Sequence, residues 1–281
     1  MTNSFILVND EVTNKFHALD RGLAYGDGLF ETMRYVNGQI PLLVAHMARL
    51  EKGCRALSIQ FHSELFRKRL DQVIQHVQRS TLSPVLIKMI VTRGLAGRGY
   101  FPADDGEATT VIATFPMSDV PISHSNEGIA VKICEASLPT NRKLAGIKHL
   151  NKLDYVLASR EWQNEGFDEG LLLDENGNVV EATSRNIFAI KDGVLLTPSI
   201  DGCGVAGVLR AVILSEVSSD LALISREVSF AVNDLMESDE IFLCNSVTGV
   251  WPVQRVGGIS LTNKNPVTKR IQAFLKTKYG Y

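Results

Sequence analysis

Strand-like and helix-like segments alternate along the whole chain, and one polar stretch interrupts the alternation near the middle. Residues 116–128 (PMSDVPISHSNEG) hold two prolines and three serines and end in a glycine, a composition typical of a linker. We therefore expect an N-terminal α/β domain over 1–117, a linker over 118–127 and a C-terminal domain over 128–281. The length of 281 residues agrees with two domains of about 150 residues each.

The N-terminal half carries four runs rich in β-branched and apolar residues and two amphipathic segments with helical spacing. We predict strands at 5–8, 31–36, 84–92 and 109–115 and helices at 43–57 and 63–79. Ser63 is expected to cap the second helix, because a serine hydroxyl can accept a hydrogen bond from the unpaired amides of a first turn.

The C-terminal half also mixes strands with helices. We predict strands at 129–134, 170–173, 179–190, 194–197, 221–228, 240–245 and 250–256. Helices are predicted at 150–163, at 205–217 and from Pro266 to the C-terminus. Interleaving of this kind in both halves is typical of an α+β or α/β protein.

Charge and cysteine content exclude several classes of protein. The chain has 29 Lys and Arg against 31 Asp and Glu, so its net charge of −2 offers no general attraction for a nucleic acid or an anionic membrane. The four cysteines are far apart and form no CxxC pair, so we expect no metal site and no disulfide framework. No secretory signal or apolar run of about 18 residues is recognisable, so a cytoplasmic location is expected.

Lys148 lies in a basic stretch with Arg142, Lys143, His149 and Lys152. Neighbouring positive charges favour the neutral form of a lysine, and the neutral amine is the form that attacks a carbonyl carbon. A lysine that forms a Schiff base needs such surroundings. The simpler interpretation is a solvated basic face.

Glu181 is a carboxylate inside the strand-forming run VVEATSRNIFAI. Alternation places Val179, Glu181 and Thr183 on one face of that strand. A buried carboxylate there would need a cationic partner, and a protonated pyridine nitrogen would serve. The simpler interpretation is an exposed strand position.

The segment GCGVAG, Gly202 to Gly207, matches GxGxxG and precedes a predicted helix. A dinucleotide site needs a strand that runs directly into the first glycine, but the turn at 197–201 intervenes, although Glu227 has the right spacing for a ribose contact. A glycine-rich entry to a helix can still bind one phosphate through its amides. The alternative is a tight turn without a ligand.

An amine, a carboxylate and a phosphate cradle together suit pyridoxal phosphate, and seven motifs extend the match over most of the chain. They are DRGLAYGDGLFETMR (20–34), HMARL (46–50), TRGLAGRGYFP (92–102), GIKHLNKLDYVLASRE (146–161), DEGLLLDENGNVVEATSRNIF (168–188), LLTPSIDGCGVAGVLR (195–210) and CNSVTGVWPV (244–253). With these motifs the chain resembles the pyridoxal-phosphate enzymes of the branched-chain aminotransferase, D-amino-acid aminotransferase and aminodeoxychorismate lyase group. The resemblance implies their two-domain fold, fold type IV, in a homodimer that acts on a small molecule.

The resemblance also implies roles for individual residues. Lys148 would carry pyridoxal 5'-phosphate and move protons, and Glu181 would pair with the pyridinium nitrogen. The phosphate would be bound by a set of side chains and backbone amides, namely Arg49, Val205, Ala206, Ser246 and Val247.

One position argues for the lyase branch of this group. Aminotransferases of the family usually place Tyr where this chain has Phe30, and GRGY, GIKHLN and CGVAG resemble the lyases. The expected reaction is therefore the conversion of 4-amino-4-deoxychorismate to 4-aminobenzoate and pyruvate, a step of folate synthesis. Lys152 departs from the Arg that the resemblance leads us to expect there, but the departure is minor because lysine keeps the positive charge. The alternatives are an aminotransferase acting on D- or branched-chain amino acids and a ligand-binding protein without activity.

The expected substrate carries two carboxylates, which cationic side chains should bind. Arg93 and Arg98 are the candidates, with Tyr100 beside them, and Arg34 could take the same role. The alternative is a Gly-rich surface hairpin with solvated arginines. Thr32 is a further candidate near the cofactor.

Overall fold

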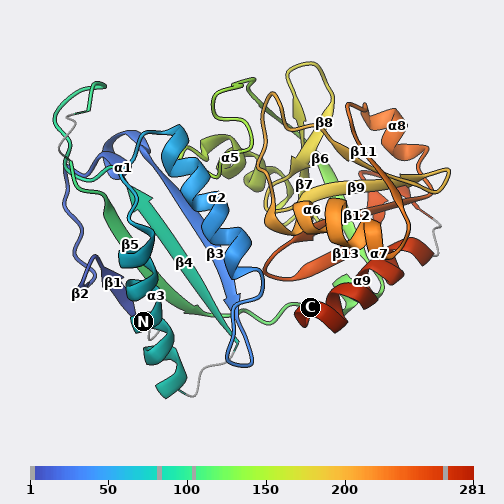
Figure 1. The fold of residues 1–281 in the computed structure, drawn as a ribbon. Helices are drawn as coiled ribbons and strands as arrows, with labels where there is room; N and C mark the ends of the chain where they lie inside the picture. The colour runs from blue at the N-terminus through green and yellow to red at the C-terminus, as the bar shows by residue number, and fades with distance from the viewer. Residues whose placement is uncertain (1–3, 81–83, 103–105, 262–264) are drawn as a thin grey trace. The chain divides into compact units, whose positions relative to one another are not determined.

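The computed structural model describes residues 4–80, 84–102, 106–261 and 265–281. The chain divides into two compact units (Figure 1). The N-terminal unit comprises Met1–Ser118 and Ile147–Asn151, and the C-terminal unit comprises Asp119–Gly146 and Lys152–Tyr281. The expectation that Lys148 belongs to the C-terminal domain is therefore wrong, because its segment packs with the N-terminal unit.

The N-terminal unit is built on an antiparallel sheet, in which the described strands follow the order β2-β1-β5-β4-β3. The strands are β1 (Ile6–Val8), β2 (Glu11–Val12), β3 (Gly28–Tyr35), β4 (Val85–Thr92) and β5 (Thr109–Pro116). The helices are α1 (Arg21–Tyr25), α2 (Leu43–Ala56) and α3 (Ser63–Arg79). α3 has the predicted bounds, but its N-cap is His62 and the Ser63 hydroxyl makes no capping bond.

Helices α2 and α3 cover one face of this sheet (Figure 1). Along β3 the buried and half-buried residues alternate, so Leu29 and Met33 point into the core under the helices. Leu70 and Val73 of α3 are fully buried there. The opposite face of β3 carries Phe30, Thr32 and Arg34, which are half-buried.

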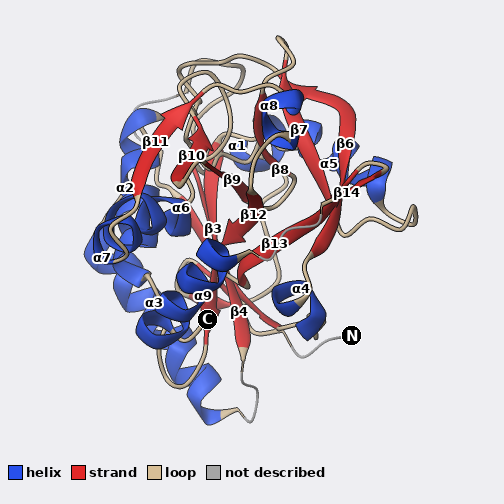
Figure 2. Ribbon diagram, turned by 90° about the vertical axis from the view of Figure 1, so that its right-hand side faces the viewer, coloured by secondary structure: helices blue, strands red, loops and turns tan. Residues whose placement is uncertain are grey.

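The C-terminal unit is built on a larger sheet, in which the described strands follow the order β11-β10-β9-β12-β13-β6-β7-β8. The strands are β6 (Ile129–Leu138), β7 (Glu169–Asp174), β8 (Val179–Ala182), β9 (Asn186–Lys191), β10 (Val194–Pro198), β11 (Ile224–Val228), β12 (Glu240–Asn245), β13 (Gly249–Val256) and β14 (Ile259–Ser260). β8 also pairs with β9, so the strands from β9 through β13 to β8 close on themselves. Figure 2 shows β9, β12 and β13 side by side.

Helices pack on this sheet or connect its strands. They are α4 (Ile122–Asn126), α5 (Leu153–Trp162), α6 (Val208–Val212) with a π-helical continuation over Ile213–Val217, α7 (Ser218–Asp220), α8 (Val232–Met236) and α9 (Pro266–Tyr279). The segment predicted as a linker, 118–127, contains α4. Every helix in the described part of the chain is too short or too polar to cross a bilayer.

The strand predicted over 179–190 is two strands joined by a turn at Thr183–Arg185. The turn closes when the amide of Ala182 donates to the carbonyl of Arg185. Both Thr183 and Ser184 donate hydroxyl hydrogen bonds to buried Glu169. Since Glu169 comes from β7, the break depends on a partner that is remote in the sequence.

The helix predicted over 205–217 begins three residues later, at Val208. Val205 instead forms an isolated parallel bridge with Gly146, and Gly207 is the N-cap with extended dihedral angles. The glycine-rich segment is therefore a turn that precedes the helix.

Candidate active site

Lys148 is fixed by backbone pairing along the edge of β3. The amide of Phe30 donates to the carbonyl of Lys148 at 3.1 Å, and the amide of Leu150 donates to the carbonyl of Gly28 at 3.0 Å. The Lys148 Nζ lies 4.4 Å from the centroid of the Phe30 ring. The main chain of Lys148 is thus held like a strand residue, while its amine lies over an aromatic face.

A second lysine approaches the same ring. Lys88 of β4 is the cross-strand partner of Thr32, and its Nζ lies 5.6 Å from the Phe30 ring centroid. The face of the sheet opposite the helices therefore presents two lysine side chains at Phe30. Lys88 was missed in the sequence, although a single lysine in the apolar run VLIKMIVT is a visible signal.

Arg49 of α2 is oriented by a buried carboxylate. Its Nε and Nη2 donate to the two oxygens of Glu31 at 2.7 and 2.6 Å, and His46 Nδ1 lies 2.6 Å from Oε2 of Glu31. Burial raises the pKa of Glu31, but the charge of Arg49 and the hydrogen bonds from His46 and Arg49 outweigh it and lower the pKa to about 2. The ionised carboxylate therefore fixes the plane of the guanidinium group.

The guanidinium group of Arg93 is hydrogen-bonded within the N-terminal unit. Its Nε and Nη2 donate to the two oxygens of Asp27 at 2.8 and 3.1 Å. Nη1 donates to the carbonyl of Ser58 and Nη2 also to that of Leu57. All three nitrogens of its guanidinium group have protein partners, which hold the side chain between Asp27 and the carbonyls of Leu57 and Ser58.

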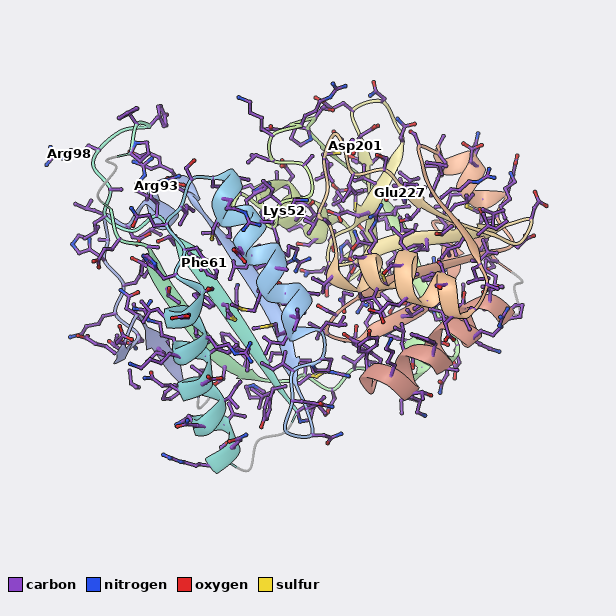
Figure 3. The ribbon with its side chains drawn as sticks, in the orientation of Figure 1. Lys52, Phe61, Arg93, Arg98, Asp201 and Glu227 are labelled. Carbon is purple, nitrogen blue, oxygen red and sulfur yellow. The ribbon has the colours of Figure 1, made fainter. Side chains whose placement is uncertain are left out.

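The loop that follows Arg93 leaves two other candidates exposed. Arg21 shares Asp27 with Arg93 and donates to the carbonyls of Gly99 and Tyr100, which ties the loop to α1. The Tyr100 side chain is 90% exposed. Arg98 extends from the outer end of the loop, away from Arg93 (Figure 3). The Tyr100 ring is tilted against the ring of Tyr25, with a centroid distance of 5.7 Å.

Glu181 is 3% exposed, which excludes the interpretation as an exposed strand position. Tyr155 donates its hydroxyl to Oε1 at 2.5 Å. Asn186 Nδ2 and the amide of Val205 donate to Oε2 at 2.9 and 3.2 Å. The donors come from α5, from the start of β9 and from the glycine-rich turn, so three segments orient one carboxylate.

The two amides expected to bind phosphate already have acceptors. The amide of Val205 donates to Glu181, and that of Ala206 donates to the carbonyl of Gly146 at 3.0 Å. The helix begins at Val208, and its first amides belong to Val208 and Leu209. These later amides are the ones that the positive end of the helix would offer to an anion.

Glycine is required at position 207 for close packing. A Cβ there would lie 1.8 Å from Oδ1 of Asn186, the residue that donates to Glu181. The turn therefore packs its main chain against Asn186, a hydrogen-bond donor to the Glu181 carboxylate.

Ser246 and Val247 lie in the turn between β12 and β13. The amides of Val247 and Thr248 both donate to Oδ1 of Asn245, at 3.0 and 2.9 Å. Arg185 Nη2 donates to the Thr248 hydroxyl at 2.6 Å. The Val247 amide is thus engaged within the turn, whereas Ser246 is half-buried at its apex.

The chain resembles known enzymes over nearly its whole length. Residues 28–256 match the model of the amino-transferase class IV family. An aminodeoxychorismate lyase of Vibrio harveyi is 31% identical over 92% of this chain and 94% of its own length.

Two solved structures share the fold. A 4-amino-4-deoxychorismate lyase from Pseudomonas aeruginosa has a TM-score of 0.93 and 35% identity, covering 98% of this chain and 100% of that chain. A branched-chain amino acid aminotransferase from Escherichia coli has a TM-score of 0.85 and 27% identity, covering 99% and 95%. The fold class expected from the sequence motifs is confirmed.

Proposed function

Because this chain belongs to the class IV aminotransferase family, we propose that it is a pyridoxal-phosphate-dependent aminodeoxychorismate lyase. It converts 4-amino-4-deoxychorismate to 4-aminobenzoate and pyruvate. The observation that carries the choice of the lyase is the amine of Lys148 over the ring of Phe30, where the aminotransferases of the family usually have Tyr. The greater similarity to the lyase structure than to the aminotransferase structure supports the same choice.

The described residues fit the proposed cofactor. Glu181 is buried with three hydrogen-bond donors, an environment that suits an ionised carboxylate facing a cationic N–H. Lys148 supplies the amine, and Arg49 supplies a guanidinium held in one plane. When bound, pyridoxal 5'-phosphate supplies an electron sink for the carbon that carries the substrate nitrogen.

Lys148 has two tasks in this proposal. Its amine, in the neutral form, would hold the cofactor, and Nζ would take the proton from the carbon bearing the substrate nitrogen. Nζ then returns a proton as pyruvate leaves. The backbone pairing with β3 keeps the position of the residue constant through both tasks.

Glu181 retains a proton on the ring nitrogen of the cofactor. Its buried carboxylate accepts three hydrogen bonds, which stabilise the ionised form that a cationic partner requires.

The phosphate is bound in this proposal by Arg49, by the Ser246 hydroxyl and by the amides of Val208 and Leu209. The last two replace Val205 and Ala206, whose amides are engaged elsewhere. Glu31 orients Arg49 for this contact. Val247 does not bind the phosphate in this proposal, because its amide donates to Oδ1 of Asn245.

The substrate carboxylates meet cations on the face of the N-terminal sheet that carries Phe30. Lys88 is the closest of these to the ring apart from Lys148. Thr32 lies across from Lys88 and offers a hydroxyl on the same face, and Arg34 follows on the same strand. Together they replace Arg93 as the candidate carboxylate ligands.

The protein is a homodimer in this proposal. Arg98 and Tyr100 extend from one subunit and contribute to substrate binding in the partner subunit. Exposed apolar side chains lie on this loop and at or next to α1, to which Arg21 ties the loop, and exposed apolar side chains in one region are typical of an interface. They are Leu19, Leu23, Leu95, Tyr100 and Phe101.

The cysteines of the chain are free and mostly buried, which agrees with a cytoplasmic enzyme.

An aminotransferase is the second candidate, because the family and the Escherichia coli structure are shared with that activity. A ligand-binding protein without activity is disfavoured by the presence of both Lys148 and Glu181. The two enzymes are separated by incubating the purified holoenzyme with aminodeoxychorismate, and separately with D- or branched-chain amino acids plus 2-oxoglutarate. The proposal predicts pyruvate in the first reaction; glutamate in the second without pyruvate in the first would refute it.

A further inference from the structure

Tyr155 is a half-buried polar residue beside Glu181. It lies in the first turn of α5, and its hydroxyl donates to Oε1 of Glu181 at 2.5 Å. The donors to the other oxygen, Asn186 and the amide of Val205, come from the sheet and the glycine-rich turn. Tyr155 is therefore the donor through which α5 acts on the carboxylate.

The surroundings of Tyr155 keep its hydroxyl protonated. Its ring packs in an apolar cluster with Leu172 and Val180, and the Lys152 ammonium lies 4.2 Å from the ring centroid. Burial raises the pKa of the phenol far above its usual value, and the charge and hydrogen bond of Glu181 add to that effect. A phenol in this position donates a hydrogen bond to the carboxylate over the whole neutral pH range.

We propose that Tyr155 is a positioning residue for the reaction, which holds the Glu181 carboxylate ionised and in one orientation toward the ring nitrogen of the cofactor. The inference rests on the proposed role of Glu181. Hydrogen bonds to an ionised carboxylate favour its charged form, and a charged carboxylate facing the ring nitrogen stabilises the proton there, so the loss of the Tyr155 donor weakens that stabilisation. The ring nitrogen then loses its proton at a lower pH.

The test uses holoenzyme reconstituted with cofactor labelled with ¹⁵N in the ring, and follows the ¹⁵N resonance as the pH is raised. Y155F keeps the ring and its packing and removes only the hydroxyl. We expect the loss of the ring proton to move down by about one pH unit, a tenfold change in the equilibrium. We also expect kcat to fall about tenfold with little change in KM.

Two further substitutions test whether the change in ring protonation is due to the hydrogen bond of Tyr155. Placing 3,5-difluorotyrosine at position 155 gives a stronger donor, and the transition should then move to higher pH than in the wild type. Y279F removes a hydroxyl that donates to an exposed carboxylate, Glu216, at 2.7 Å, and it should move neither the resonance nor kcat.

E181Q separates failure of this inference from failure of the proposed function. If E181Q abolishes ring protonation and Y155F leaves it at the wild-type pH, the role of Tyr155 is refuted and that of Glu181 stands. If E181Q leaves the resonance as in the wild type, the cofactor does not depend on Glu181 and both proposals fall. A shift in Y155F and an opposite shift with difluorotyrosine support the inference.

Discussion

Replacing Glu31 by glutamine should destabilise the N-terminal unit in a manner that depends on pH. The side chain is 1% exposed and carries the charge that pairs with Arg49 and His46. Glutamine keeps the shape and an acceptor but leaves the Arg49 guanidinium without a countercharge, and breaking a buried pair in this way typically costs about 3–5 kcal/mol. We expect E31Q to lose stability in that range at pH 7.

The pKa of Glu31 gives an independent magnitude. Folding lowers it from 4.5 to about 2, which corresponds to about 3 kcal/mol of stability at neutral pH. Because the folded value is the lower one, this contribution is fully present above pH 4.5 and is lost as the pH falls toward 2. The difference between wild type and E31Q should therefore be constant from pH 7 to about 5 and shrink by roughly half by pH 3.5.

Amide hydrogen exchange of α2 and β3 measures the opening free energy of this unit at each pH. The matched control is E51Q, which removes an exposed carboxylate paired with Arg55 one helical turn away. That substitution should cost less than about 1 kcal/mol at every pH. An E31Q protein within 1 kcal/mol of the wild type at pH 7, or a difference that persists unchanged at pH 3.5, would refute the reasoning.

Further substitutions test other parts of the site. Gly207→Ala would bring a Cβ to within 1.8 Å of Asn186 Oδ1, so cofactor affinity should fall at least about tenfold by fluorescence titration, whereas Gly258→Ala, with no atom within 4 Å, should have no effect. Asp27→Asn should loosen the loop that its two arginine partners hold, and tryptic cleavage after Arg98 should accelerate about tenfold; an unchanged rate would contradict this role. Arg98→Ala should raise KM about tenfold without changing the melting temperature, because a charge-assisted contact to a carboxylate is lost and no bond within the fold is broken.

Local patterns were enough to predict most elements. α3 has its predicted bounds, and β4 and β5 were predicted to within one residue at each end, because their alternation and spacing are properties of the segment itself. The break at 183–185 and the late start of α6 were not predicted. Each depends on a partner from another part of the chain, Glu169 in the first case and Gly146 in the second.

The same distinction applies to the site. Glu181 could be singled out because a carboxylate is conspicuous in an apolar run, but Tyr155 and Glu31 became significant only through contacts across the fold. Arg93 was expected to bind substrate, and only the structure shows that its guanidinium group also donates to Asp27 and Ser58. The sequence was enough to predict the residue types of the site. The structure was needed to show which of these side chains are already engaged in hydrogen bonds within the fold.

The account depends most on Lys148 as the amine that attaches the cofactor. The direct measurement is reduction of the holoenzyme with borohydride, followed by peptide mapping by mass spectrometry. We predict one phosphopyridoxyl group per chain on Lys148, and none in a K148A protein treated in the same way. A modified lysine elsewhere, or a cofactor still attached to K148A, would contradict the assignment on which the proposed reaction rests.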